Sequence, residues 1–183
     1  PTSQLEMDKR SLITPIHPKQ NDAAIRIASF NVLNYFNGDG QGNGFPTERG
    51  AASAKQLARQ QTKIVAAITA LDADIIGLME VENDGYDKYS AITELTNAIN
   101  QRSDIQYAVA QPHSIRIGAD QISVAMLYNK QRFNVVNHAL THDSGPFKRG
   151  SRVPLAQVFK DTVSEQRLTV VVNHFKSKGG CPE

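Results

Sequence analysis

Three short apolar runs, each rich in β-branched residues and each ending in a polar side chain, constrain the fold of this chain most. The runs lie at residues 25–31, 75–83 and 168–178. Each run is short enough for a buried strand, and the polar residues near their carboxyl ends are Asn31, Glu80 and His174. Ligands of α/β proteins commonly bind at strand ends, where loops open a crevice. An amide, a carboxylate and an imidazole that meet there suit a metal-assisted attack on a phosphate.

The apolar residues between these runs predict an α/β domain. Helical spacing predicts helices over residues 52–71, with Ser53 as N-cap, and over residues 87–101. The predicted strands cover residues 25–33, 74–81, 105–110, 122–129, 132–138, 153–161 and 167–175. Residues 121–128 alternate only loosely, so we expect burial on both of their faces. Residues 129–131 resemble a hairpin connection.

Composition sets wide bounds on function. A chain of 183 residues suits one domain, and its net charge of +2 neither demands nor excludes a polyanionic partner, so any basic surface must be local. No apolar stretch is long enough to span a bilayer, and no secretory signal is visible at Pro1. Residues 1–24 are expected to form a linker or an arm. The single cysteine, Cys181, is either a free surface thiol or lacks its partner in this chain.

Five stretches of the sequence together carry a resemblance to a known family. They are Ala28–Phe36, Gly38–Gly50, Leu71–Asn83, Ser151–Phe159 and Val171–Lys178. In this order they resemble the endonuclease/exonuclease/phosphatase superfamily, which has the deoxyribonuclease I-like fold. More narrowly, the chain is similar to the secreted bacterial extracellular nucleases of that superfamily. The match runs from Ile25 to the last residue.

The resemblance implies a two-sheet α/β sandwich with outer helices, built from two similar halves. Residues 25–183 match only the first half, because the family's later Gly-Asp-x-Asn and Asp-His signatures do not occur here. Half a sandwich is expected to expose one apolar sheet face. We therefore expect the second half to accompany this chain as a separate fragment, a further stretch of chain or a swapped partner, with Cys181 paired to it.

Glu80 is the candidate metal ligand. It directly follows the apolar residues 75–79, where a carboxylate needs a partner. Mg²⁺ is bound by one or two carboxylates together with phosphate oxygens and water. The resemblance implies that Glu80 binds the metal and that Asn31, the family's first-strand asparagine, holds a metal-bound water or a phosphate oxygen. Mg²⁺ is the expected ion, with Ca²⁺ and Mn²⁺ as alternatives, while Glu82 and Asn83 are expected to shape the rim.

His174 and Arg152 are the candidate phosphate contacts. By resemblance, His174 is the first of two catalytic histidines, since an imidazole can hydrogen-bond a phosphoryl oxygen or move a proton. Such a histidine needs an orienting acceptor; Asp120 is the candidate, with an ordinary loop role as the alternative. The resemblance also implies that Arg152, in preference to Arg149, contacts substrate phosphate through two guanidinium N–H groups.

Two further features lie near these residues. Four basic side chains could form a rim for a nucleic acid backbone or simply a solvated surface: Lys148, Arg149, Lys176 and Lys178. The glycine-rich segment 38–44 lacks the ending of a phosphate-binding P-loop. Asp39 within it fits no EF-hand spacing, so we expect a flexible lip.

Together these features predict a secreted, divalent-metal-dependent nuclease that hydrolyses DNA phosphodiester bonds with low sequence specificity; RNA is a second substrate to test. The base that activates the attacking water would lie partly in the second half, so the chain alone is expected to be inactive. Two alternatives stay open: a phosphoesterase of the same fold acting on a phospholipid or inositol phosphate, and a non-catalytic nucleic-acid-binding fragment. The resemblance implies an extracellular, periplasmic or cell-surface location in a bacterium and no membrane partner.

Overall fold

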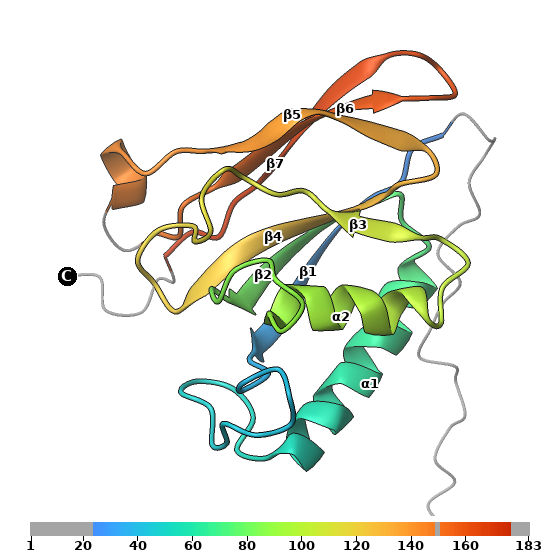
Figure 1. Cartoon of the computed structure of the whole chain (residues 1–183). Helices are drawn as coiled ribbons and strands as arrows, with labels where there is room; N and C mark the ends of the chain where they lie inside the picture. The colour runs from blue at the N-terminus through green and yellow to red at the C-terminus, as the bar shows by residue number, and fades with distance from the viewer. Residues whose placement is uncertain (1–23, 149–150, 177–183) are drawn as a thin grey trace, which may run out of the picture.

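A computed structural model describes residues 24–148 and 151–176 of the chain. Its elements, in chain order, are β1 (Ile27–Tyr35), α1 (Ala54–Leu71), β2 (Ile75–Glu82), α2 (Ala91–Asn100), β3 (Tyr107–Val109), β4 (Ile122–Asn129), β5 (Phe133–Thr141), the 3-10 helix η1 (Gly145–Lys148), β6 (Leu155–Asp161) and β7 (Arg167–Val172). They form two stacked sheets with α1 and α2 on the outer side of one of them (Figure 1). This is the predicted two-sheet α/β sandwich.

The four-stranded sheet has the order β1-β2-β4-β3, and the three-stranded sheet has the order β5-β6-β7. The helix α1 connects β1 to β2, which run parallel, so both strands end at the same edge of the sheet. All other neighbouring strands in the two sheets are antiparallel. The shared ends of β1 and β2 point to the left in Figure 1, toward the loop that follows β1.

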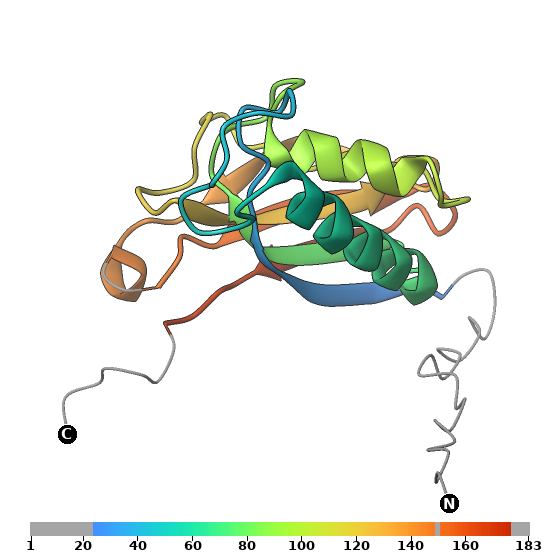
Figure 2. The ribbon, with the colours of Figure 1, turned by 90° about the horizontal axis from the view of Figure 1, so that it is seen from below.

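Two apolar clusters hold the layers together. One lies between the helices and the four-stranded sheet and includes Ile68, Leu95, Ile76 and Leu78; Figure 2 shows both helices covering that side of the sheet. The other lies between the sheets and includes Val124, Met126, Phe133 and Phe159. Because β4 contributes to both clusters, its first six residues are buried, which confirms the expected burial on both faces.

Local signals explain the helix starts. The Ser53 side chain accepts a hydrogen bond from the Gln56 backbone N–H at 3.3 Å, which confirms the predicted N-cap of α1. The helix α2 begins at Ala91 and not at residue 87, because the Asp87 carboxylate accepts a hydrogen bond from the Tyr89 N–H and closes a turn there.

The connection at residues 129–131 was wrongly predicted as a hairpin. The strand β4 pairs with β2 and β3, whereas β5 pairs with β6 in the other sheet. The turn therefore carries the chain from one layer to the next. A short polar connection between two apolar runs has the same sequence pattern in either case, so the pattern could not separate them.

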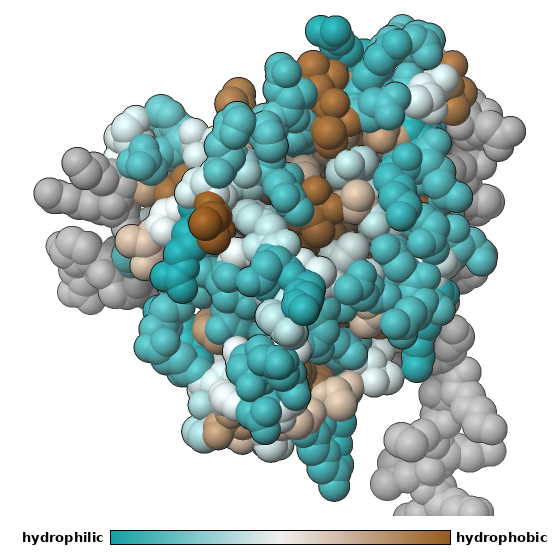
Figure 3. Space-filling view, in the orientation of Figure 1, coloured by the Kyte–Doolittle hydropathy of each residue, from teal (hydrophilic) through white to brown (hydrophobic). Residues whose placement is uncertain are grey.

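The expected uncovered sheet face is the outer side of β5, β6 and β7, over which no described helix packs. Along β6 the burial alternates, and the outward residues Ala156, Val158 and Lys160 are only half-buried. Val171 of β7 is 50% exposed on the same side. Apolar surface is visible over this sheet in the upper part of Figure 3. The facing sides of β2, β4 and β6 are buried, so the chain supplies strands to both layers and not one sheet alone.

Several predictions fall outside the described residues. They concern the arm at residues 1–23, Arg149, Lys178 and Cys181. Among the helices that the structure describes, none combines the length and the apolar character that crossing a membrane requires.

Candidate active site at the strand ends

The pairing of β1 with β2 becomes irregular over a short stretch of both strands. Their pairing is regular up to Asn31 opposite Met79 and shifts before Tyr35 meets Val81. Within this irregular stretch Glu80 has a φ of 66°, and Leu33 has a φ of 58°. Bulges of this kind re-aim side chains and are frequent beside active sites, and non-glycine residues with positive φ are costly and cluster at functional sites. The distortion marks the level of Asn31 and Glu80 as a candidate site.

The Glu80 carboxylate is held by β1. Its Oε1 accepts a hydrogen bond from the Asn31 side-chain nitrogen at 2.9 Å, and its Oε2 accepts one from the Asn34 backbone N–H at 3.1 Å. The Asn31 Oδ1 accepts the Leu33 N–H at 2.8 Å, which fixes the orientation of the amide. The Gln60 side chain of α1 ties the distorted strand to the helix by donating to the Leu33 carbonyl at 2.7 Å. Each carboxylate oxygen keeps a lone pair for a further ligand.

His174 lies beside Glu80, two residues beyond β7. Its carbonyl accepts the Arg152 backbone N–H at 3.1 Å, which extends the pairing of the two chain segments. Gly77 of β2 permits the close approach of the sheets here, because a Cβ at this position would lie 2.7 Å from the Val172 side chain. The His174 Nε2 is 3.7 Å from the Glu80 Oε1, too far for a hydrogen bond. Its Nδ1 is buried and has no hydrogen-bond partner among the described residues.

Asp120 lies between two arginines and does not orient His174 through a hydrogen bond. Its Oδ1 is 2.9 Å from an Arg49 guanidinium nitrogen, and its Oδ2 is 3.2 Å from the Arg152 Nε. The expected Asp120–His174 pair is therefore absent from the described structure. Two cations attract the carboxylate more strongly than a histidine that is charged only when protonated. Asp120 instead positions the guanidinium groups of Arg49 and Arg152 beside the site.

Asn83 explains why Asp120 lies there. This side chain is buried and donates to the carbonyls of Ile117 and Asp120 at 3.0 and 2.9 Å, while its oxygen accepts the Ile117 N–H at 3.0 Å. The loop before β4 is thereby fixed to the end of β2. The sequence suggested only a rim position for Asn83. Its proximity to Glu80 is the one signal that could have pointed to this role.

Glu82 and Asp84 fasten the neighbouring loops. The Glu82 carboxylate accepts the Asn37 N–H at 3.0 Å, and the Asp84 carboxylate accepts the Ala91 N–H at 2.9 Å at the start of α2. Burial is the main cause that raises the pKa of Glu82 to about 7 and the pKa of Asp84 to about 6. The nearby charge of Arg116 lowers both pKa values, but by less than burial raises them.

The glycine-rich segment 38–44 folds back on itself. The Asp39 Oδ1 accepts the backbone N–H groups of Gln41 and Asn43 at 2.8 and 2.9 Å, and its Oδ2 accepts the Asn43 side chain. These hydrogen bonds, that from the Asn43 backbone first, lower the pKa of Asp39. Asp39 thus closes its own loop, in agreement with the absence of a calcium-loop spacing.

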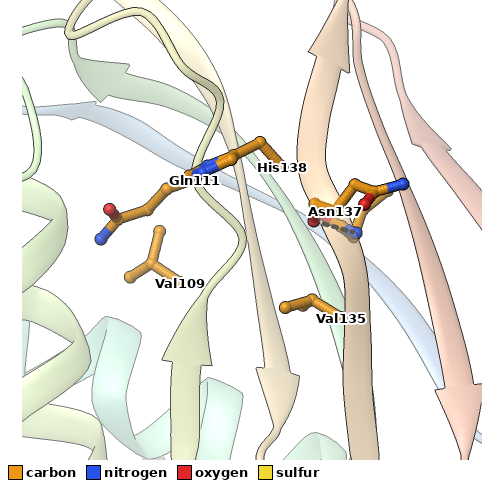
Figure 4. Close-up of a pocket in the computed structure, with 6 residues that line it drawn as sticks. Val109, Gln111, Val135, Asn137 and His138 are labelled. Atoms are coloured by element: carbon orange, nitrogen blue, oxygen red, sulfur yellow. Dashed lines mark hydrogen bonds between the residues drawn. The ribbon is translucent and has the colours of Figure 1, made fainter.

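Two of the cavities in the described structure bear on where the candidate site lies. One of about 480 Å³ is lined by Asp120, Ser151 and Arg152. Another of about 320 Å³ lies between β3 and β5, where Gln111, Asn137 and His138 surround it (Figure 4). None of the site residues predicted from the sequence lines this second cavity. The strand ends therefore carry the candidate site.

Glu80 with Asn31 fits one part of a magnesium site. Both offer hard oxygen atoms, and Mg²⁺ needs as few as one protein carboxylate when phosphate and water complete its shell. Asn31 turns its nitrogen to Glu80, so its first role is to hold the carboxylate, with one lone pair of its oxygen left over. Within residues 24–148 and 151–176, no three His, Cys, Asp or Glu side chains form a group that could hold a metal ion. The described residues supply a single-carboxylate site.

Only part of the predicted basic rim can be placed. Lys176 is exposed two residues after His174, and its backbone N–H donates to the Ser151 hydroxyl at 3.3 Å. The side chain of Lys148, like the whole of Arg149 and Lys178, lies outside what the structure describes. The rim remains a prediction.

The sequence matches no protein-family model and no curated protein. The structure, however, is similar to the human Nocturnin catalytic domain, which was solved with a bound sulfate anion. The TM-score is 0.52, and the sequences are 17% identical over 85% of this chain. This chain shares the fold of the matched part of that domain. It spans 51% of the Nocturnin catalytic domain, and the fold expected from the sequence resemblance is confirmed.

Two other solved structures are similar to part of this chain. An endonuclease/exonuclease/phosphatase family protein from Leptotrichia buccalis has a TM-score of 0.48 and 14% identity, with 84% of this chain and 54% of that chain covered. ANGEL2, a 2′,3′-cyclic phosphatase, has a TM-score of 0.42 and 17% identity, with 62% of this chain and 30% of that chain covered.

Proposed function

We propose that this chain is the first half of a secreted, divalent-metal-dependent nuclease that hydrolyses phosphodiester bonds of DNA with low sequence specificity. One observation carries the proposal: Glu80, Asn31 and His174 meet at distorted strand ends, beside the paired cations Arg49 and Arg152. A carboxylate for a metal, an imidazole with an unused nitrogen and nearby guanidinium groups are the groups that a phosphodiester needs. RNA is the second substrate to test.

The described residues would bind and orient the scissile phosphate. Glu80, held by Asn31, would bind the Mg²⁺, with Ca²⁺ and Mn²⁺ as alternatives. When bound, the metal polarises the phosphate and offsets the developing negative charge. His174 donates to one phosphoryl oxygen through a ring nitrogen, and Arg152 donates to another. The similar Nocturnin catalytic domain was solved with a bound sulfate, and sulfate, like phosphate, is a tetrahedral oxyanion.

The activation of the attacking water is assigned to the second half of the domain. Asp120 is engaged by Arg49 and Arg152, and the described residues place no other carboxylate within hydrogen-bond reach of His174. The proposal therefore includes a second-half partner, and the chain alone is expected to be inactive. The location outside the bacterial cell, in the periplasm or at the cell surface follows from the sequence resemblance and belongs to this proposal.

Two other functions compete with a nuclease. A phosphoesterase for a phospholipid or an inositol phosphate could use the same strand-end groups, since the fold alone does not select the substrate. A fragment that only binds nucleic acid could keep the arginines without catalysis. We favour the nuclease because the Glu80 carboxylate is held on both oxygens and its backbone is strained, a combination that binding to nucleic acid alone does not require.

Plasmid degradation tests the proposal once the composition of the protein is known. Native and denaturing mass spectrometry, with and without reductant, shows whether a second polypeptide accompanies the chain. The protein in its complete form is then incubated with supercoiled DNA, with RNA and with the lipid and inositol substrates, in Mg²⁺ or in EDTA. We expect Mg²⁺-dependent cleavage of DNA and no turnover of the lipid or inositol phosphates.

Glu80→Gln is the decisive variant. It keeps the hydrogen bond from Asn31 but removes the charge that would hold the metal, and we expect DNA cleavage to fall on the order of a thousandfold. Glu165→Gln is the matched control, because Glu165 is an exposed carboxylate in the turn between β6 and β7. Cleavage that persists in EDTA, or that is equally fast in both variants, would refute the proposed function.

A further inference from the structure

One face of α1 carries positive charge only. Lys55, Arg59 and Lys63 follow one another at intervals of four residues, all three are exposed, and the 18 residues of the helix contain no acidic side chain. Like charges at this spacing destabilise a helix. No ion pair within the described chain offsets that cost for Arg59 or Lys63. Because the whole chain has nearly balanced charge, 20 basic against 18 acidic residues, the stripe is a local concentration.

The stripe borders a groove that starts at the candidate active site. The groove has a volume of about 450 Å³, and its lining residues include Asn34, Arg49, Gln56, Arg59, Gln60 and Lys63. Asn34 is the residue whose N–H donates to Glu80. Arg49 pairs with Asp120, which lines the cavity that contains Arg152. Positive groups therefore continue from the site of the proposed cleavage along α1, and no carboxylate lines the groove.

Leu33 adds an apolar contact at the mouth of this groove. Its side chain is 73% exposed although the residue has a φ of 58°, a conformation that a leucine adopts at a cost. An asparagine would relieve that strain and remove the exposed apolar surface. A nucleotide strand, by contrast, offers both charged phosphates and apolar sugar and base surfaces.

We propose that this groove binds the nucleic acid strand that flanks the scissile phosphate, with phosphates on Arg49, Arg59 and Lys63 and a sugar or base against Leu33. The inference rests on the proposed nuclease function and names its substrate more closely: a strand with several consecutive phosphates. Arg59 and Lys63 are about 6 Å apart along the helix axis, so they meet different phosphates of one strand. A dinucleotide, with one phosphate, does not reach them from the cleavage site.

Fluorescence anisotropy with labelled oligothymidylates of 2 and 12 nucleotides tests the groove. The protein in its complete form, with any second polypeptide that accompanies the chain, is titrated in EDTA, so that no cleavage interferes, over a series of salt concentrations. For the double variant Arg59→Gln/Lys63→Gln, the loss of two phosphate contacts lowers the salt slope of 12-mer binding by about 1.4 and weakens binding on the order of tenfold at 0.1 M salt. Binding of the dinucleotide does not change. Leu33→Asn weakens 12-mer binding about threefold without changing the salt slope.

Arg102→Gln/Lys130→Gln is the matched control. Both residues are exposed and lie at the opposite end of the sheet, where the Lys130 N–H donates to the Gln106 carbonyl. This variant removes the same charge, and we expect it to bind both oligonucleotides like the wild type. If the groove variant behaves like this control, or if it loses dinucleotide binding equally, the groove proposal is overturned while the nuclease proposal stands. If the wild-type protein in its complete form binds no oligonucleotide of either length, both proposals fail.

Discussion

At one end of the sandwich the buried charged groups are paired with one another, whereas at the other end they are incompletely paired. At the end opposite the candidate site, Arg132 donates from its Nε and Nη2 to both oxygens of Asp161 at 3.1 and 3.3 Å, and its Nη1 lies 3.5 Å from Asp74. All three residues are at most 8% exposed. At the candidate site, the His174–Glu80 distance is 3.7 Å, and the His174 Nδ1 has no described partner.

The pKa values of the carboxyl groups differ between the two ends in the same way. Hydrogen bonding to Arg132 is the main cause that lowers the pKa of Asp161 to about 2. Burial, which outweighs the charge of Arg116, raises the pKa of Glu82 to about 7 and that of Asp84 to about 6. A saturated cluster of charges stabilises the fold and has nothing left to bind a ligand. Charges that the fold leaves incompletely paired are those that a metal ion or a phosphate can complete.

The largest expected effect on stability comes from a substitution in the fully paired cluster of charges. Arg132→Ala leaves Asp161 and Asp74 buried without their guanidinium, and removing one partner of a buried ion pair costs about 3–5 kcal/mol. Chemical denaturation at pH 7 should show a loss of this size in the free energy of unfolding. Since Arg132 lies in the turn between the layers, a loss below about 1 kcal/mol would mean that the cluster does not join the two sheets energetically.

A smaller effect is expected on the pH dependence of the stability, through Asp84 at the end that carries the candidate site. A carboxyl group with a raised pKa binds its proton more tightly in the folded state than in the unfolded state. The protein therefore loses stability as the pH rises from the pKa of the unfolded state to the raised pKa of the folded state. For Asp84 this window runs from 3.8 to about 6. Asp84→Asn keeps an acceptor for the Ala91 N–H and removes the ionisation. Above pH 6 the variant should be more stable than the wild type by about 1 kcal/mol, after allowance for solvent screening.

Thermal or chemical denaturation of both proteins between pH 4 and 7.5 checks this. The stability difference between Asp84→Asn and the wild type should grow up to pH 6 and then stay level. The Asp161 pKa acts in the other direction, because its stabilisation is present above pH 4 and is lost as the pH falls toward 2. A difference that grows on acidification instead would show that the charge of Asp84 at the start of α2 stabilises the fold, and the contrast between the two ends would be lost.

Local patterns predicted the elements of this fold, and long-range contacts decided its site. The N-cap at Ser53 and the buried strand at residues 122–129 follow from short-range signals. The apolar runs predicted that Asn31, Glu80 and His174 lie close together, but Asn31 lies at a bulge within β1 and not at its end. The pairing of Asp120 with Arg49 joins residues 71 positions apart, and no periodicity contains such a contact. The bulge at Glu80 was equally hidden, because the alternation of side chains does not report a positive φ.

The smallest expected effect is the sharpest test of the contrast. Arg152→Gln removes a guanidinium as Arg132→Ala does, but Asp120 keeps Arg49 at 2.9 Å, and the Arg152 side chain is 20% exposed. Ion pairs that reach solvent contribute little, so the free energy of unfolding should change by about 0.5 kcal/mol or less. Phosphate or sulfate binding, followed by calorimetry, should weaken clearly in the same variant. A loss of stability near that of Arg132→Ala, with anion binding intact, would make Arg152 a structural residue and leave His174 and Arg49 as the groups that meet the phosphate.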